Sequence, residues 1–362
     1  MRRSLTLCIT ATAALLSLSF SEAVGKETKP DYHLGSTPDT VVWGYWAAET
    51  KPALKVKSGQ IVEIDIVSMG GMPDDKPEQF FIDNGISLDL PVVKEMIALK
   101  KAPKPEGARG ALTGPIYIEG ANPGDTLEVR VLEIKSRAPY GINSGGPGRG
   151  GIPDLVPRPF SKVIKLDLKR NVGIYSDTIE VPLGHFQGMM GIAPTPDRGR
   201  LPSSPPYPDI GGNFDNKHFG KGATVYFPVQ VPGALFQVGD PHAAQGNGEV
   251  SISAIESSNT VTLQFIVRKD MPLKVVRAET PTHYIVMGLD EDLRLAMRKA
   301  ILETITFLGE TRHLDFFDAL GLASIGVDYE VTEVVDKTNG IHAMIPKKLF
   351  KDYKPESYWF KP

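Results

Sequence analysis

The frequency of glycine and proline limits the fold of this chain more than any other feature. They account for 36 and 30 of its 362 residues. Both residues are unfavourable inside helices and common in turns. Hydrophobic residues make up 41% of the chain and charged residues 23%, which is typical of a soluble globular protein with a buried core. The sequence therefore predicts a globular protein that is rich in strands and loops.

Short segments with strand character recur along most of the chain. Residues 60–68 alternate aliphatic and acidic side chains, which is typical of a strand with one solvent-facing side. A turn at residues 122–125 separates two further strand-like segments and predicts a hairpin. Other strands are predicted at residues 41–46, 162–168, 178–183, 224–231, 250–256, 260–268, 273–277 and 284–287. Many short strands separated by turns favour a sandwich or a barrel.

Helical patterns are concentrated near the C-terminus. Apart from one short helix predicted between Asp89 and Pro103, the clearest pattern is the apolar stripe of residues 291–308. A second helix at 314–323 and a closing strand at 330–335 follow it. We expect a mainly β fold with three parts: a signal peptide at residues 1–23, a jelly-roll-like β-sandwich catalytic region at 24–288, and a smaller α+β portion at 289–362.

The segment from residue 138 to 159 is rich in glycine, is interrupted by proline and has no periodicity. Its glycine spacing could suggest a phosphate-binding loop. No helix follows it, however, and the Lys-Ser/Thr pair of such loops is missing. The segment is therefore interpreted as a surface loop.

The N-terminus has the pattern of an export signal. Arg2 and Arg3 precede an apolar run over residues 5–18, and Ser21 and Ala23 fit a signal-peptidase site. The apolar run is too short for a membrane span, which needs about 20 residues. The pattern predicts cleavage near residue 23 and a periplasmic or secreted protein. The single cysteine, Cys8, lies in this segment, so the mature chain has no thiol chemistry.

The charge of the chain bears on its partners. The formal net charge is −3, and removal of residues 1–23, with two arginines and one glutamate, makes it −4. A mildly acidic chain lacks the basic surface of a nucleic-acid-binding protein. No later apolar run is long enough to cross a bilayer. The expected partner is therefore a small molecule, with neither nucleic acid nor, after cleavage, a membrane.

Residues 238–256, VGDPHAAQGNGEVSISAIE, form the principal candidate site. Asp240, His242, Gln245 and Glu249 lie close together among glycines, which let a backbone approach a ligand closely. The segment ends in an alternating pattern. The polar side chains are therefore predicted to lie on a turn that leads into a strand.

These residue types suit either a divalent metal, zinc or calcium, or a general base. The candidate metal ligands are Asp240, His242 and Asp215. Asn213 and Asp215 belong to a GGNFD turn at residues 211–215. For any one of these residues alone, the alternative is a turn cap, because Asp and Asn side chains bond to their own backbone in turns. Their clustering favours a site.

Several other polar residues are weaker candidates. Glu119 ends a predicted strand beside Gly120 and could point into a cleft, with an ordinary solvent-facing position as the alternative. His185 could be a ligand, but a lone histidine is more often structural. The remaining histidines after residue 200 are interpreted as structural or exposed: His218, His283, His313 and His342.

Missing motifs narrow the chemistry further. The chain has no HExxH, no GxSxG nucleophile elbow and no cysteine nucleophile in its mature part. What remains is water activated by carboxylates, by histidine or by a metal.

The sequence resembles the acetamidase/formamidase family. The resemblance covers most of the mature chain, and its GDPHAAQGNGE block is the most specific part. The matching segments are 114–129 (GPIYIEGANPGDTLEV), 188–194 (GMMGIAP), 211–215 (GGNFD), 228–256 and the C-terminal VTEVVDKTNGIHAMIPK. The resemblance implies hydrolysis of short linear amides, such as formamide or acetamide, to a carboxylate and ammonia.

The resemblance also implies roles for single residues. It matches Glu249, Asp240, Asn213 and Glu119 to polar positions of the family motifs, and these residues are the catalytic candidates. As a mechanism hypothesis, Glu249 is the base that takes a proton from water. Gln245 and Gly212 are the candidate substrate-binding residues. A homo-oligomer is implied as well. The alternative function is that of an exported β-sandwich protein that binds a metal or a ligand without turnover.

Overall fold

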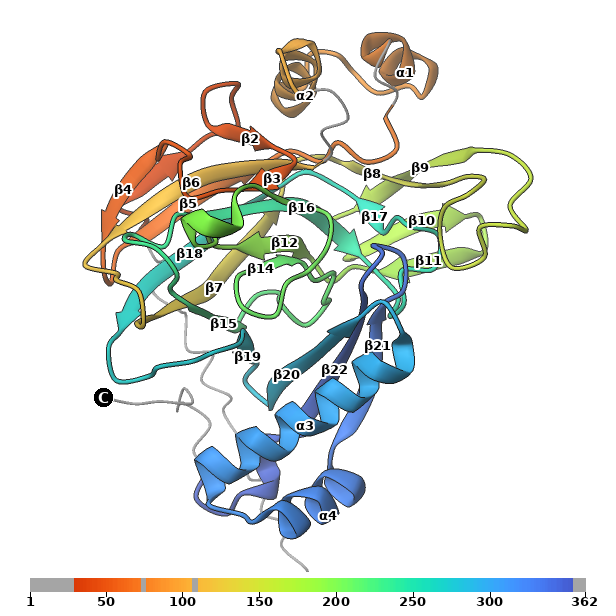
Figure 1. Ribbon diagram of the computed structural model, residues 1–362. Helices are drawn as coiled ribbons and strands as arrows, with labels where there is room; N and C mark the ends of the chain where they lie inside the picture. The colour runs from red at the N-terminus through yellow and green to blue at the C-terminus, as the bar shows by residue number, and fades with distance from the viewer. Residues whose placement is uncertain (1–28, 73–75, 106–109, 354–362) are drawn as a thin grey trace, which may run out of the picture.

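The computed structural model describes residues 29–72, 76–105 and 110–353 (Figure 1). The predicted signal peptide and Cys8 lie outside these residues. Two large β-sheets form the body of the described chain, with helices at opposite ends of the molecule (Figure 1). Among the described residues, no helix combines the length and the apolar character that a bilayer crossing requires.

The first sheet has nine strands and includes both early and late parts of the chain. Its central pair, β18 and β7, is antiparallel and runs from Asn259 opposite Ser136 to Arg268 opposite Thr126. In spatial order its strands are β1 (Tyr32–Leu34), β5 (Ile61–Ile66), β18 (Asn259–Arg268), β7 (Thr126–Ser136), β15 (Thr224–Pro228), β19 (Arg277–Glu279), β20 (His283–Asp290), β22 (Asn339–Pro346) and β21 (Asp328–Glu333).

The second sheet has eleven strands and contains the principal candidate segment. Its main path is β11 (Ile179–Pro182), β10 (Val172–Ser176), β9 (Phe160–Asp167), β8 (Tyr140–Gly145), β17 (Ile255–Glu256), β16 (Phe236–Ala244), β12 (Phe186–Gly191) and β14 (Gly211–Asn213). β6 (Ala111–Glu119) branches from β16 and also pairs with β2 (Val41–Trp43) and β4 (Leu54–Lys57). A separate pair joins β3 (Tyr45–Trp46) to β13 (Leu201–Pro202).

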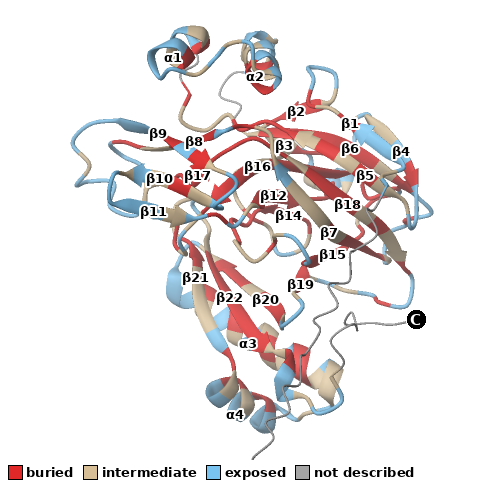
Figure 2. Ribbon diagram, turned by 180° about the vertical axis from the view of Figure 1, so that it is seen from behind, coloured by how far each residue is buried: buried red, intermediate tan, exposed pale blue. Residues whose placement is uncertain are grey.

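The main hydrophobic core lies between the two sheets. Alternating residues of β5, β7 and β18 point into it from the first sheet, as the alternation at residues 60–68 predicts. β6 and β16 close it from the second sheet, and Figure 2 shows these central strands as largely buried. Core residues from both sides include Ile64, Val129, Leu263, Ile116, Phe236 and Val238. The prediction of a mainly β sandwich is therefore confirmed.

The helices lie at the two ends of the sandwich. α1 (Pro77–Asp83) and α2 (Pro91–Lys101) lie at one end, with two short 3₁₀ turns elsewhere at Pro196–Arg198 and Lys347–Leu349. α3 (Leu293–Arg312) and α4 (Phe316–Gly326) pack at the other end, as predicted for the C-terminal portion. Strands β22 and β21 of that portion continue the nine-stranded sheet beside β20, and residue 289, where that portion was predicted to begin, lies inside β20.

Two strand predictions are wrong for local reasons. Residues 250–254 form a turn, and only Ile255–Glu256 of the predicted strand is extended. Glu249 and Ile252 have positive φ angles of 43° and 68°, which no regular strand permits. The strand predicted at 273–277 begins instead at Arg277.

The predicted hairpin around residues 122–125 is also wrong. β6 and β7 belong to different sheets, so the turn carries the chain across the sandwich. Its backbone bonds to the β15–β16 connection, with Gly124 N donating to Val229 O at 3.1 Å. α1 and β22 were not predicted, and β8 lies within the segment interpreted as a loop.

Candidate active site

Asp240 and His242 lie inside strand β16, although the sequence predicted a turn. They are two residues apart, and the His242 Nε2 to Asp240 Oδ2 distance is 3.3 Å. β16 pairs with β12 on one side and with β6 and β17 on the other, so the backbone beneath the site is held from both sides. Asp240 has a positive φ of 54°, an irregularity that re-aims a side chain within a strand.

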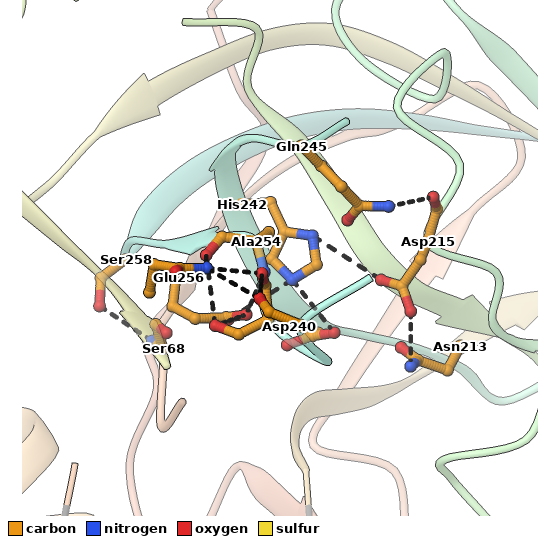
Figure 3. Close-up of polar contacts among 12 residues, drawn as sticks. Ser68, Asn213, Asp215, Asp240, His242, Gln245, Ala254, Glu256 and Ser258 are labelled. Carbon is orange, nitrogen blue, oxygen red and sulfur yellow. Dashed lines mark hydrogen bonds and ion pairs between the residues drawn. The ribbon is translucent and has the colours of Figure 1, made fainter. Parts of the chain in front are cut away.

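Glu256 is the second carboxylate that faces Nε2 of the His242 imidazole. It lies opposite His242 in the β16–β17 pairing, and its Oε2 is 3.4 Å from His242 Nε2. Its other oxygen accepts hydrogen bonds from Ser253 Oγ at 3.2 Å and from the Ala254 backbone N at 3.1 Å. These bonds fix the carboxylate in the arrangement shown in Figure 3.

Asp215 approaches the other nitrogen of His242. Its Oδ1 lies 3.7 Å from His242 Nδ1, and its backbone has a positive φ of 47° after the short strand β14. Asn213 Nδ2 donates to Asp215 Oδ2 at 2.7 Å and also to Asp336 Oδ2 (Figure 3 shows the Asp215 bond). Gln245 Nε2 donates to the Asp215 backbone oxygen at 2.8 Å. Asn213 and Gln245 therefore hold the acidic residues in place.

Glu249 enters the same cluster from the 246–249 turn. Its carboxylate is buried, and single ligand atoms of Asp215, His242 and Glu249 lie within 4.8 Å of one another. Asp240, His242 and Glu256 satisfy the same condition. These side chains form one cluster, which we call the amide cluster after the amide substrates that the sequence resemblance implies. Its members are Asp215, Asp240, His242, Glu249, Glu256 and Asp336.

Gly188 of β12 leaves the space in which these side chains meet. A Cβ atom there would lie 2.4 Å from Asp215 Oδ1 and 2.6 Å from Asp240 Oδ2. It would also lie 3.0 Å from His242 Cε1. Contacts below 3.0 Å are repulsive, so any side chain at this position would displace the carboxylates.

The burial of the acidic residues changes their pKa values. Burial raises the pKa of Asp215 well above its usual range, and the nearby Glu249 and Asp336 carboxylates raise it further. Burial likewise raises the pKa of Glu249, and it raises that of Asp336 to about 6. Burial alone would lower the pKa of His242, but Glu256 and Asp240 outweigh it and raise that pKa. The cluster therefore holds protons strongly or needs a cation.

The donor atoms of the amide cluster fit a divalent metal. Asp215 Oδ1, Glu256 Oε2 and both ring nitrogens of His242 are buried and have no hydrogen-bond partner among the described residues. Buried polar atoms are normally satisfied, so these atoms indicate an additional ligand. Carboxylate oxygens with an imidazole nitrogen form a donor set typical of zinc.

A pocket of about 780 Å³ is lined by Asp240 of the amide cluster, by Met189 of β12 and by Lys100 of α2. Its wall contains aromatic, methionine and cationic side chains: Trp43, Phe80, Phe160, Met69, Met72, Lys100, Lys104 and Arg149. This volume is within the range of small-molecule sites.

Two of the predicted residues do not reach the amide cluster. Glu119 is exposed at the end of β6, next to Lys57 of β4, whereas the part of β6 beside the site is Leu112, opposite Gly239. Gly212 lies in β14, where an added Cβ would contact Pro205 O at 2.7 Å. Its observed role is therefore close packing.

The structure brings in three residues that the sequence did not single out. Glu256 was interpreted as part of a strand, and Asp336 is 123 positions away from its partner Asn213. Gly188 belongs to the GMMGIAP segment, which the sequence resemblance matched only as a whole. A glycine inside an apolar strand was the available signal, because it often marks a close approach.

Comparisons with known proteins identify sequences that are similar to this chain. Residues 202–352 match the model of the Acetamidase/Formamidase family. Formamidase from Methylophilus methylotrophus is 26% identical over 324 residues, which cover 68% of this chain and 78% of that protein. The putative formamidase C869.04 of Schizosaccharomyces pombe is 23% identical over 321 residues, 66% of this chain and 77% of that protein.

Solved structures extend the similarity over most of the fold. A predicted acetamidase/formamidase from the thermophile Thermoanaerobacter tengcongensis has a TM-score of 0.74 and 27% identity, covering 89% of this chain and 97% of its own. Acetamidase from Bacillus halodurans has a TM-score of 0.72 and 27% identity, covering 88% and 98%. The resemblance found in the sequence is thereby confirmed.

Proposed function

Because this chain is similar to acetamidases and formamidases in both sequence and fold, we propose that it hydrolyses the carbon–nitrogen bond of short linear amides. The observation that carries the proposal is the convergence of four carboxylates, Asp215, Asp240, Glu249 and Glu256, on the buried imidazole of His242. Such a site can hold and activate a water molecule beside a small amide.

In this proposal Glu249 is the general base. Burial raises the pKa of Glu249 toward neutral pH, so the group can accept a proton and later release it. The water oxygen attacks the amide carbon as Glu249 takes its proton. When the carbon–nitrogen bond breaks, that proton passes to the leaving nitrogen, so the products are a carboxylic acid and ammonia.

The other residues position the reacting groups. His242 is held between Asp240 and Glu256 on one side and Asp215 on the other. Both amide hydrogens of Asn213 are directed to carboxylates, so we assign it a positioning role and no contact with the oxyanion. Asp240, His242 and Glu256, whose ligand atoms meet at His242 Nε2, would hold a divalent metal, which when bound supplies positive charge for the negative oxygen that develops on the amide. Asp215, which the sequence predicted as a ligand of the same metal, faces Nδ1 on the other side of the ring.

The proposal includes an exported location. Residues 1–23 have the charged, apolar and small-residue regions of a signal peptide. A metal- or ligand-binding protein without turnover is the alternative, and both functions predict binding at the amide cluster. Only turnover separates them.

The decisive experiment measures ammonia release by the purified protein from formamide, acetamide and a longer linear amide. Glu249→Gln keeps the size of the side chain and removes its basic oxygen. We expect the turnover rate to fall by about 10²- to 10⁴-fold, the usual contribution of a general base. Substrate affinity and thermal stability should change little.

Glu119→Gln is the matched comparison, since it makes the same change on an exposed strand end. Its rate should stay within about threefold of the parent. Metal content measured on the same preparations separates base from ligand: retained metal with lost turnover supports the base. A parent protein that binds metal or amide and releases no ammonia would instead establish the binding protein.

A further inference from the structure

A second cluster of metal-ligating side chains lies outside the amide cluster. Glu330 of β21 and His342 of β22 are directly opposite each other in the antiparallel pairing, so their side chains leave the same face of the sheet. His218, from the segment between β14 and β15, meets them from the side. One ligand atom from each residue lies within 4.8 Å of the other two.

The distances within this cluster are unusual for hydrogen bonds. Glu330 Oε2 lies 3.5 Å from His342 Nε2 and 3.8 Å from His218 Nε2. Hydrogen bonds between nitrogen and oxygen are about 2.7–3.2 Å long. Ligand atoms about 2.1 Å from a tetrahedral zinc ion lie about 3.4 Å from one another. The observed spacing is therefore closer to that of donors sharing one ion.

The orphaned nitrogens point to the same conclusion. His342 is fully buried, and its Nε2 has no hydrogen-bond partner among the described residues. The Nε2 atom of His218 is also buried and has no hydrogen-bond partner among these residues, whereas the rest of the His218 side chain is partly exposed. A buried imidazole nitrogen without a partner is costly unless something binds to it.

A supporting contact orients one of the ligands. His342 Nδ1 lies 2.8 Å from Thr332 Oγ1. When Nδ1 donates its hydrogen to this hydroxyl, Nε2 presents its lone pair to the cluster, which is how histidine ligands of metals are usually fixed. Asn247 Nδ2 similarly donates to Glu330 Oε2.

We infer that His218, Glu330 and His342 form a second metal site, which takes a zinc-like divalent cation. Two imidazole nitrogens and one carboxylate oxygen make up a common set of three zinc ligands from a protein. The site uses no residue of the amide cluster.

The position of this site indicates its effect. His218 follows Asp215 by three residues, and Asn247, bonded to Glu330, precedes Glu249 by two. Gly248 N also donates to Thr332 O at 2.9 Å. A metal at the second site would therefore fix both segments that deliver Asp215 and Glu249 to the amide cluster.

The test uses full-length protein stripped with a chelator, titrated with Zn²⁺ by calorimetry and with Co²⁺ by visible absorption. Glu330→Gln and His218→Asn should each weaken one binding event by at least about 10²-fold, because a ligand is lost. His283→Asn, on neighbouring β20, is the matched control and should bind as the parent does.

His242→Asn distinguishes the two sites. It should leave the event that Glu330→Gln removes, whether or not the protein turns over amides. Circular dichroism confirms that each variant is folded, and Glu330 is partly exposed, so its substitution should be tolerated. Zn²⁺ and Co²⁺ titrations of Glu330→Gln and His218→Asn that both match the parent would overturn the inference.

Discussion

At the scale of single residues, the absence of one side chain shapes the amide cluster. Gly188 provides the gap in which Asp215, Asp240 and His242 approach one another. Its φ angle is not in the left-handed region, so the requirement for glycine is one of space and not of backbone conformation. The sequence shows a glycine, but only the packing shows why no side chain fits there.

Gly188→Ala tests this requirement. The added methyl group would push the two carboxylates and the imidazole apart, and small displacements of catalytic groups cost about 10²-fold in rate. We expect kcat/KM for amides to fall by about that factor while the protein stays folded. Gly184→Ala is the control, because an added Cβ there meets nothing within 4 Å. Equal rates for both variants would contradict the assignment.

At the scale of elements, helix α3 approaches strand β20 unusually closely. Gly288 of β20 faces Ala296 and Ala300 of the helix, and an added Cβ would lie 2.1 Å from Ala296 O and 2.2 Å from Ala300 N. Both alanines are fully buried. Asp292 caps the helix by accepting a hydrogen bond from Leu295 N at 2.9 Å. Small residues and a cap thus attach the C-terminal helix to the nine-stranded sheet.

Gly288→Ala should separate this helix from the sheet. Because the contacting atoms are helix backbone, they can move only if the whole element shifts, and overpacking of this kind costs about 3 kcal/mol. Chemical denaturation would show the loss as a lower midpoint. Gly321→Ala in α4 introduces the same methyl group into open space, so its midpoint should be unchanged or higher. A parent-like midpoint for Gly288→Ala would show that the packing is looser.

At the scale of the whole molecule, buried acidic residues link stability to pH. Glu333 is fully buried beside Asp336 of the amide cluster, and its Oε2 accepts hydrogen bonds from the backbone N of Val335 at 2.8 Å and of Asp336 at 3.2 Å. Burial, together with the Asp336 carboxylate, raises the pKa of Glu333 to about 8. The folded protein therefore keeps this proton at pH values where the unfolded chain, with a pKa of about 4.3, has lost it.

The direction of the pH effect follows from linkage. The contribution of Glu333 is fully present below about pH 4.3 and is lost as pH rises toward 8, because deprotonation then favours the unfolded chain. Glu333→Gln removes this titration and keeps an oxygen for the two backbone donors. With chelator present, its Tm should match that of the parent near pH 5 and exceed it by about 2 °C or more at pH 9.

Glu291→Gln is the control for this measurement, since that side chain is exposed. It should follow the parent at every pH. A constant difference in Tm between Glu333→Gln and the parent from pH 5 to 9 would show that Glu333 does not titrate in this range.

Much of the fold could be predicted because its signals are local. The alternation at residues 60–68 reappears as β5, and the apolar stripe of residues 291–308 reappears as α3. The residues Asp240, His242 and Glu249 could be selected because they share one short segment of the chain. Asn213 and Asp215 could be selected because they share the GGNFD turn at residues 211–215. In each case the relevant residues are close in sequence, so periodicity or spacing carries the information.

What only the tertiary structure decided depends on pairing between distant segments. Alternation shows which side of a strand is apolar, but it does not select the neighbouring strand, so β6 and β7 looked like a hairpin although they belong to opposite sheets. Glu256 reaches His242 through cross-strand pairing, and Asp336 reaches Asn213 across 123 positions. The same pairing sets Glu330 beside His342, which the sequence had suggested was merely structural or exposed. Such contacts depend on how two sheets enclose a common core, a property of the packed molecule that no short stretch of sequence contains.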